Sequence, residues 1–106
     1  MTDEQDAATE ERRWHLLCVD DEPNILSALR RLFRQNGYQI TIANGGKEGL
    51  EVLEANPGEI DLVISDMRMP EMDGAQFLEQ VREKWPDITR ILLTGYADIS
   101  STIAAI

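Results

Sequence analysis

One short segment constrains the fold of this chain more than any other. Residues 62–64 are aliphatic and do not alternate with polar residues, a pattern typical of a strand that is buried on both faces of a parallel sheet. Asp66 follows this strand, and Pro70 and Gly74 then predict a turn. In open α/β sheets, ligands bind at the carboxyl ends of the strands, where the strand order reverses. Asp66 is therefore a candidate functional residue by its position alone.

Three other segments also have the composition of strands. Residues 16–19 form a second unalternating apolar run, which ends in two consecutive aspartates. Residues 38–42 alternate apolar and polar side chains, which predicts an edge strand. Residues 88–93 form a fourth strand, which is followed by Thr94. Because the apolar runs belong in the centre of the sheet and the alternating strand at its edge, we expect the spatial order 2-1-3-4.

The segments between these strands have the apolar periodicity of helices. After Pro23 the apolar residues recur at helical spacing until Gly37, and we expect this stripe to face the core. The stripe consists of Ile25, Leu26, Leu29, Leu32 and Phe33. A second helix with a thin apolar face stops at residues 56–58, a third ends before Pro86, and Asp98 caps a fourth. The order βαβαβαβα with short connections predicts an α/β fold with a doubly wound parallel sheet.

Composition limits the function and the location of the protein. Acidic residues outnumber basic ones by 20 to 10, and a net charge of −10 repels nucleic acids and anionic membranes. No segment approaches the roughly 20 apolar residues that cross a membrane. The single cysteine, Cys18, lies in an apolar run, which fits a reducing compartment. We therefore expect one cytoplasmic domain over residues 14–106, preceded by a disordered acidic tail at residues 1–13.

Polar side chains meet at one rim of the predicted sheet. The group consists of Asp20, Asp21, Asp66 and Thr94. Two carboxylates about 4 Å apart repel each other by about 4 kcal/mol at an effective dielectric constant of about 20. A hard divalent cation offsets this repulsion, and Mg²⁺ suits a site with few carboxylates because it keeps several of its waters. With the ion present, Asp66 can act as a nucleophile toward a phosphoryl group, and Thr94 can offer its hydroxyl to a phosphoryl oxygen.

Three motifs, in this order, resemble those of the receiver domains of two-component response regulators. They are VDDEP at Val19–Pro23, DMRMPEMDG at Asp66–Gly74 and TGYAD at Thr94–Asp98. The resemblance begins near Leu16 and implies a flavodoxin-like fold of five strands. It also implies that Asp20 or Asp21 holds Mg²⁺ together with Asp66 and the backbone carbonyl of Arg68.

The same resemblance implies a role in signalling. A partner histidine kinase or phosphotransfer protein would phosphorylate Asp66 in a phosphorelay, and Thr94 would be the switch residue. A receiver domain accepts a phosphoryl group and is not an enzyme that turns over a substrate. The resemblance therefore predicts a phosphoprotein that depends on magnesium.

The sequence departs from the family pattern near its C-terminus. Receiver domains carry a lysine at the end of a fifth strand, and neither Lys47 nor Lys84 occupies that position. We therefore expect a truncated receiver domain that lacks the fifth strand and helix, with an output domain beyond Ile106. The open fourth strand and the incompletely covered last helix also predict that the domain either self-associates through these two elements or is only marginally folded alone.

Two other functions stay open. The chain could be an inactive, protein-binding pseudo-receiver, or an aspartyl-phosphate phosphotransferase or phosphatase. Such enzymes usually place a second acid two residues after the nucleophile, where this chain has Arg68. We expect structural roles for His15 and Cys18, and we expect the methionines after Asp66 to fill gaps beneath the loop. Residues 44–48 resemble a phosphate-binding loop too weakly to predict one.

Overall fold

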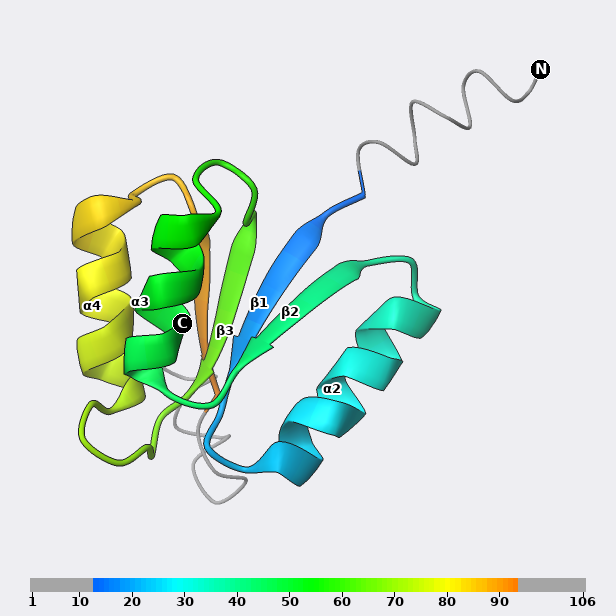
Figure 1. Ribbon diagram of the computed structural model, residues 1–106, viewed down its shortest axis with the longest axis horizontal. Helices are drawn as coiled ribbons and strands as arrows, with labels where there is room; N and C mark the ends of the chain where they lie inside the picture. Colours follow the sequence, from blue (N-terminus) through cyan, green and yellow to red (C-terminus); the bar gives the residue numbers. More distant parts are fainter. Residues whose placement is uncertain (1–12, 94–106) are drawn as a thin grey trace, which may run out of the picture.

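The computed structural model describes residues 13–93, which form a parallel sheet between two helical layers (Figure 1). The strands are β1 (His15–Val19), β2 (Gln39–Ala43), β3 (Leu62–Asp66) and β4 (Thr89–Leu93). The helices are α2 (Pro23–Gln35), α3 (Gly46–Ala55) and α4 (Gly74–Lys84). Helices α3 and α4 lie side by side on one face of the sheet, and α2 lies on the other (Figure 1).

The strand order β2-β1-β3-β4 confirms the predicted doubly wound topology. Cys18 of β1 is in register with Ile42 of β2 on one side and with Ile64 of β3 on the other. The chain first moves outward from β1 to β2 and then returns past β1 to form β3, so the strand order reverses between β1 and β3. Asp20 and Asp66 stand at the carboxyl ends of these two strands, at the position where such sheets bind ligands.

Alternate residues of β1 pack into two separate cores. Leu17 and Val19 belong to the larger core, which α3 and α4 cover. Leu16 and Cys18 point the other way, into the smaller core beneath α2. All four side chains are buried, which explains why this strand has no polar alternation.

The contact between α3 and α4 depends on glycines in the thin apolar face of α3. A methyl group on Gly49 would lie 2.8 Å from Cζ of Phe77, and one on Gly46 would lie 2.7 Å from Sδ of Met72. Real carbon atoms do not approach so closely. The glycines therefore allow the buried Phe77 ring to pack directly against the backbone of α3.

The predicted core stripe of α2 is too wide. Leu26 is buried and Leu29 and Phe33 are half-buried against the smaller core, as expected. Ile25 and Leu32, however, are 45% and 51% exposed, so their assignment to the core was wrong. The physical reason is that α2 packs over β1 and β2 at one side of the sheet, and within residues 13–93 no helix lies over β4 on this face.

Both edge strands of the described sheet carry exposed side chains, but for different reasons. The edge position of β2 agrees with its alternating sequence. Strand β4 is apolar yet also lies at an edge of the part that the structure describes, and its Ile91 and Leu93 are exposed. Ile91, together with Trp14, Phe33 and other apolar residues, lines a groove of about 400 Å³ on the α2 face.

Several predictions concern segments outside the described residues. These are residues 1–12 of the acidic tail predicted at residues 1–13, Thr94, and the last helix that Asp98 was expected to cap. Within residues 13–93, no helix has both the length and the apolar composition needed to cross a membrane.

Candidate functional site

The structure brings three of the four predicted rim residues together. Asp20 and Asp21 follow β1, and Asp66 is the last residue of the adjacent strand β3. One carboxylate oxygen from each lies within 4.8 Å of the other two. Asp20 is buried, Asp66 is half-buried and Asp21 is exposed, so the cluster opens from the sheet toward solvent.

Asp20 is the least solvated member of this cluster, with only 7% of its surface exposed. Burial raises the pKa of its carboxyl group, and the negative charges of Asp66, Asp21 and Glu22 raise it further. A hydrogen bond of 2.9 Å from the backbone N–H of Glu22 to Oδ1 acts in the opposite direction and lowers this pKa. The cluster therefore holds its negative charge unfavourably, and a bound cation would relieve it.

The donor set fits a hard divalent ion. Three carboxylates supply oxygen ligands only, and one face of the cluster is open to water. Mg²⁺ binds through one or two carboxylates and retains several water molecules, which matches this arrangement. The oxygen donors of these residues are thus of the type that magnesium prefers.

The loop after Asp66 is closed tightly beneath the cluster. The N–H of Met67 donates to the carbonyl of Leu93 at 3.0 Å, and the N–H of Gly74 donates to the carbonyl of Met67 at 2.8 Å. A side chain on Gly74 would overlap the carbonyl oxygen of Asp66. Asp73 then starts α4 with a capping box, in which its carboxylate accepts from the N–H of Gln76 at 2.8 Å. This closure fixes the end of β3 and the position of Asp66.

Two methionines of this loop have the role predicted for them. Met69 is buried in the larger core, and Met72 packs against the same core. Between them the chain makes a tight turn, in which the N–H of Met72 donates to the carbonyl of Pro70 at 2.7 Å. Glu71, at the centre of this turn, has a φ of 72°, which is unfavourable for a residue with a side chain.

Two predicted site residues are less fully defined. The side chain of Arg68 is exposed in the loop after Asp66, and the use of its backbone carbonyl as a metal ligand stays a prediction. Thr94 lies outside the described residues. Leu93, which precedes it, is in register with Asp66 on the adjacent strand, so the chain reaches the rim immediately before Thr94.

The loop between β2 and α3 also borders the cluster, which the sequence did not indicate. A pocket of about 380 Å³ is lined by Asp21, by residues 44–48 and by residues 70–72. The carboxylate of Glu48, in the first turn of α3, accepts a hydrogen bond of 2.8 Å from the N–H of Asn44. This hydrogen bond holds the loop against the start of the helix. The predicted position of β2 beside β1 is the signal that could have placed this loop near Asp21.

The two residues expected to be structural are not members of the cluster. His15 begins β1 at the opposite end of the sheet, and its Nε2 lies 2.7 Å from Oγ1 of Thr41. Cys18 is fully buried, and burial raises the pKa of its thiol to about 11. Such a thiol stays protonated near neutral pH and is a poor nucleophile.

The fold and the acidic cluster together define a structural class of protein domain. The class is that of doubly wound α/β domains with an acidic rim at the point where the strand order reverses. The family model described as "Response regulator receiver domain" matches residues 16–106. The chain belongs to this family, the receiver domains of two-component response regulators, whose members are signalling modules.

Individual relatives agree with this assignment. The chain is 43% identical over 91 residues to the transcriptional regulatory protein GlrR of Escherichia coli K12, covering 86% of this chain and 20% of GlrR. It is 41% identical over 83 residues to the sensor kinase CckA of Brucella abortus, covering 78% of this chain and 9% of CckA. The chain thus spans a fifth or less of the length of these two relatives.

Solved structures show the same fold. The response regulator TrrA of Thermotoga maritima, solved in complex with Mg²⁺ and BeF, is 37% identical with a TM-score of 0.75. That match covers 87% of this chain and 78% of TrrA. A receiver domain protein from Clostridium thermocellum gives a TM-score of 0.77 at 34% identity, covering 87% of this chain and 73% of that one.

Proposed function

We propose that this chain is a phospho-accepting signalling domain in which Asp66 is phosphorylated in a magnesium-dependent reaction. A histidine kinase or a phosphotransfer protein is the donor, and the step is part of a phosphorelay. The observation that supports this proposal most is the cluster of Asp20, Asp21 and Asp66 within 4.8 Å at the ends of β1 and β3. A similar protein also supports the proposal. TrrA was solved in complex with Mg²⁺ and BeF, and BeF bound to an oxygen atom has the tetrahedral shape of a phosphoryl group.

Each residue of the cluster has a part in the proposed reaction. Asp20, Asp21, Asp66 and the carbonyl of Arg68 would hold Mg²⁺, which neutralises negative charge on the phosphoryl oxygens. A carboxylate oxygen of Asp66 forms a bond to phosphorus while the bond from phosphorus to the donor's imidazole nitrogen breaks, and the imidazole leaves with that electron pair. The closed loop after β3 keeps Asp66 at the open side of the cluster, where a donor can reach it.

Thr94 completes the proposed site as the switch residue. It follows Leu93, which is the register partner of Asp66. From that position its hydroxyl would donate a hydrogen bond to an oxygen of the phosphorylated Asp66. Thr94→Ala should therefore leave labelling intact and weaken the conformational response to it.

Labelling with a small phosphodonor tests the proposal. The chain is incubated with acetyl phosphate, with and without Mg²⁺, and the bound phosphate per chain is measured by intact-mass spectrometry. We expect stoichiometric, magnesium-dependent labelling that Asp66→Asn abolishes and that Asp20→Ala and Asp21→Ala weaken. Asp87→Asn is the matched control, because Asp87 is an exposed aspartate in the turn before β4.

The other functions give different results in the same experiment. Continuous release of phosphate without accumulation of label would indicate an aspartyl-phosphate enzyme, although Arg68 stands where such an enzyme has its second acid. No labelling under any condition would favour a protein-binding pseudo-receiver. Label that persists in Asp66→Asn, or that is found on Ser100 or Ser101, would refute the role of Asp66.

The wider setting of the domain is also part of the proposal. We infer a cytoplasmic protein whose domain either self-associates through β4 or is only marginally stable alone. The exposed Ile91 and Leu93 on the edge strand support the self-association, because an apolar strand edge favours pairing with another chain. Light scattering over a range of concentrations tests it, and a monomer with a melting temperature independent of concentration would refute it.

A further inference from the structure

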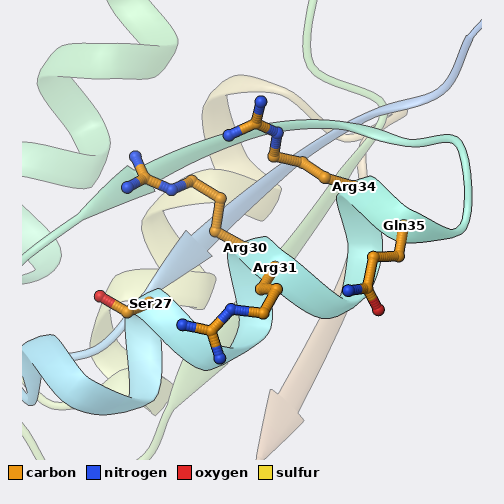
Figure 2. A pocket seen from close by; sticks show the side chains of 5 residues that line it. All are labelled: Ser27, Arg30, Arg31, Arg34 and Gln35. Atoms are coloured by element: carbon orange, nitrogen blue, oxygen red, sulfur yellow. The ribbon is translucent and has the colours of Figure 1, made fainter.

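Helix α2 carries a cluster of arginines that the proposed phosphorylation does not use. Arg30, Arg31 and Arg34, together with Ser27 and Gln35, line a surface hollow of about 510 Å³ (Figure 2). The side chains of Arg30 and Arg31 both extend from the helix toward Ser27 (Figure 2). We call the surface formed by these five residues the arginine face.

The arginine face lacks counter-charges. Helix α2 contains no acidic residue, and within residues 13–93 none of its three arginines forms a hydrogen bond or an ion pair. Two basic residues of α4 behave differently. Arg82 pairs with Glu79 at 2.6 Å, and Lys84 pairs with Glu54 of α3 at 3.0 Å. Three unpaired arginines on one helix thus form a concentrated positive surface on a chain with a net charge of −10.

Helix stability does not explain the whole cluster. The helix macrodipole favours a cation in the last turn, which accounts for Arg34. Arg30 lies four residues before Arg34, and Arg31 lies three residues before it. Like charges at these spacings destabilise a helix. An anionic partner would therefore stabilise the arginine face.

We propose that the arginine face binds an acidic peptide segment, and that its occupant is the acidic segment at residues 1–12 of this same chain. That segment contains five acidic residues and one basic residue, Arg12. The acidic residues are Asp3, Glu4, Asp6, Glu10 and Glu11. The charges of the segment and of the arginine face are therefore complementary.

The attachment point of this segment lies at the same end of the domain as the C-terminal end of α2. The carbonyl of Trp14 accepts a hydrogen bond of 2.9 Å from the N–H of Gln39, at the start of β2. The preceding residue, Tyr38, donates its N–H to Phe33 near the end of α2 at 3.0 Å. The start of β1 and the C-terminal end of α2 therefore lie at the same end of the domain (Figure 1).

The segment is also long enough to cover the helix. Twelve residues can extend over roughly 40 Å, whereas the 13 residues of α2 span about 20 Å. A short tether gives an effective concentration in the millimolar range, so weak ion pairs suffice for occupancy. Salt should weaken the contact, because all of these arginines are exposed.

A spin label tests this inference independently of phosphorylation. Ala7→Cys introduces an attachment site, and the native Cys18 does not compete for the label because it is fully buried with a raised pKa. The readout is the line broadening of the backbone amides of Ser27, Arg31 and Gln35 by NMR. We expect at least twofold loss of these signals at low salt and recovery at about 0.5 M salt.

Charge variants separate a specific contact from mere proximity. Arg30→Gln with Arg31→Gln and Arg34→Gln should abolish the broadening, and so should the segment variant with Asp3→Asn, Glu4→Gln, Asp6→Asn, Glu10→Gln and Glu11→Gln. Arg82→Gln with Lys84→Gln is the matched control and should keep the broadening. The segment variant leaves residues 13–93 unchanged, so it stays informative if the arginine variant folds poorly.

Three results would overturn the inference. Broadening that is insensitive to salt and to both charge variants would show only that the segment is tethered nearby. No broadening beyond the residues next to Trp14 would show that the arginines are simply solvated. No broadening from the label at position 7, combined with arginine-dependent shifts on adding a separate poly-glutamate peptide at about 0.1 M salt, would assign the arginine face to an external partner.

Discussion

The two ends of the sheet use carboxylates in opposite ways. At the amino end, Asp61 accepts the N–H of His15 at 2.9 Å, and the ring of His15 is in turn within 2.7 Å of Thr41. At the carboxyl end, Asp20, Asp21 and Asp66 face one another, and within the described residues no cation pairs with them. The first arrangement stabilises the fold, whereas the second leaves charge that a ligand can neutralise. The comparison separates a structural carboxylate from a functional one by its partners.

The largest expected effect is at Gly74, which closes the loop of the carboxyl end. Gly74→Ala places a methyl group against the carbonyl of Asp66 and the side chain of Leu92, so the loop must move. We expect a loss of about 3 kcal/mol in the free energy of unfolding, because a buried backbone atom cannot yield as a side chain can. Urea denaturation measures it. Ala75→Gly, at the next and exposed position, should cost only about 1 kcal/mol, and similar losses for both variants would contradict the packing argument.

Removal of the amino-end carboxylate should also destabilise the domain. Asp61→Ala leaves the N–H of His15 without its side-chain acceptor, at a residue that is only 9% exposed. We expect a loss of about 1–3 kcal/mol by the same urea measurement. Asp87→Ala, at an exposed aspartate, is the control and should change stability by less than about 0.5 kcal/mol. If Asp61→Ala were equally harmless, its carboxylate would not be structural.

Removal of a carboxylate at the carboxyl end of the sheet should stabilise the domain instead of destabilising it. The folded state raises the pKa of Asp20, mainly through burial, so it holds the proton of Asp20 more tightly than the unfolded chain does. Stability contributed by this group is therefore present at low pH and is lost as the pH rises from the usual aspartate range through the raised pKa. Asp20→Asn should accordingly raise the melting temperature at pH 7 without divalent ions, and the gain should disappear below about pH 4.

Magnesium provides the counter-test for Asp20. A ligand at 100 times its dissociation constant stabilises the folded state by about 2.7 kcal/mol. Mg²⁺ should thus raise the melting temperature of the unaltered chain and raise that of Asp20→Asn much less. An equal rise in both would remove Asp20 from the metal site, while a lower melting temperature of Asp20→Asn at pH 7 would contradict the charge argument.

The smallest expected effect is at Glu71, in the turn between the two buried methionines. Its positive φ costs about 1 kcal/mol for a residue with a side chain, and glycine avoids this cost but loses more entropy on folding. Glu71→Gly should therefore stabilise the domain by about 0.5 kcal/mol in urea denaturation. Glu71→Ala keeps the strain and should be nearly neutral, so an equal gain from alanine would show that φ is not the cause.

The strand order and the acidic cluster could be predicted from the sequence because both depend on local patterns. Unalternating apolar runs indicate central strands, and carboxylates that follow two such runs must meet if the strands are neighbours. Asp20, Asp21 and Asp66 do meet. The same reasoning placed the alternating strand at an edge, where β2 lies.

Features that depend on how separate segments pack against each other were decided only by the tertiary structure. The apolar spacing in α2 cannot tell that Ile25 and Leu32 lie beyond the edge of the helix contact, because burial depends on what packs opposite. The neighbourhood of Asn44 and Asp21 likewise follows from the pairing of β1 with β2, whose register partners, such as Val19 and Ala43, are 24 residues apart in the sequence. Local periodicity determined which residues form strands, helices and carboxylate ends, and the packing of separate segments determined which of their side chains meet each other and which meet water.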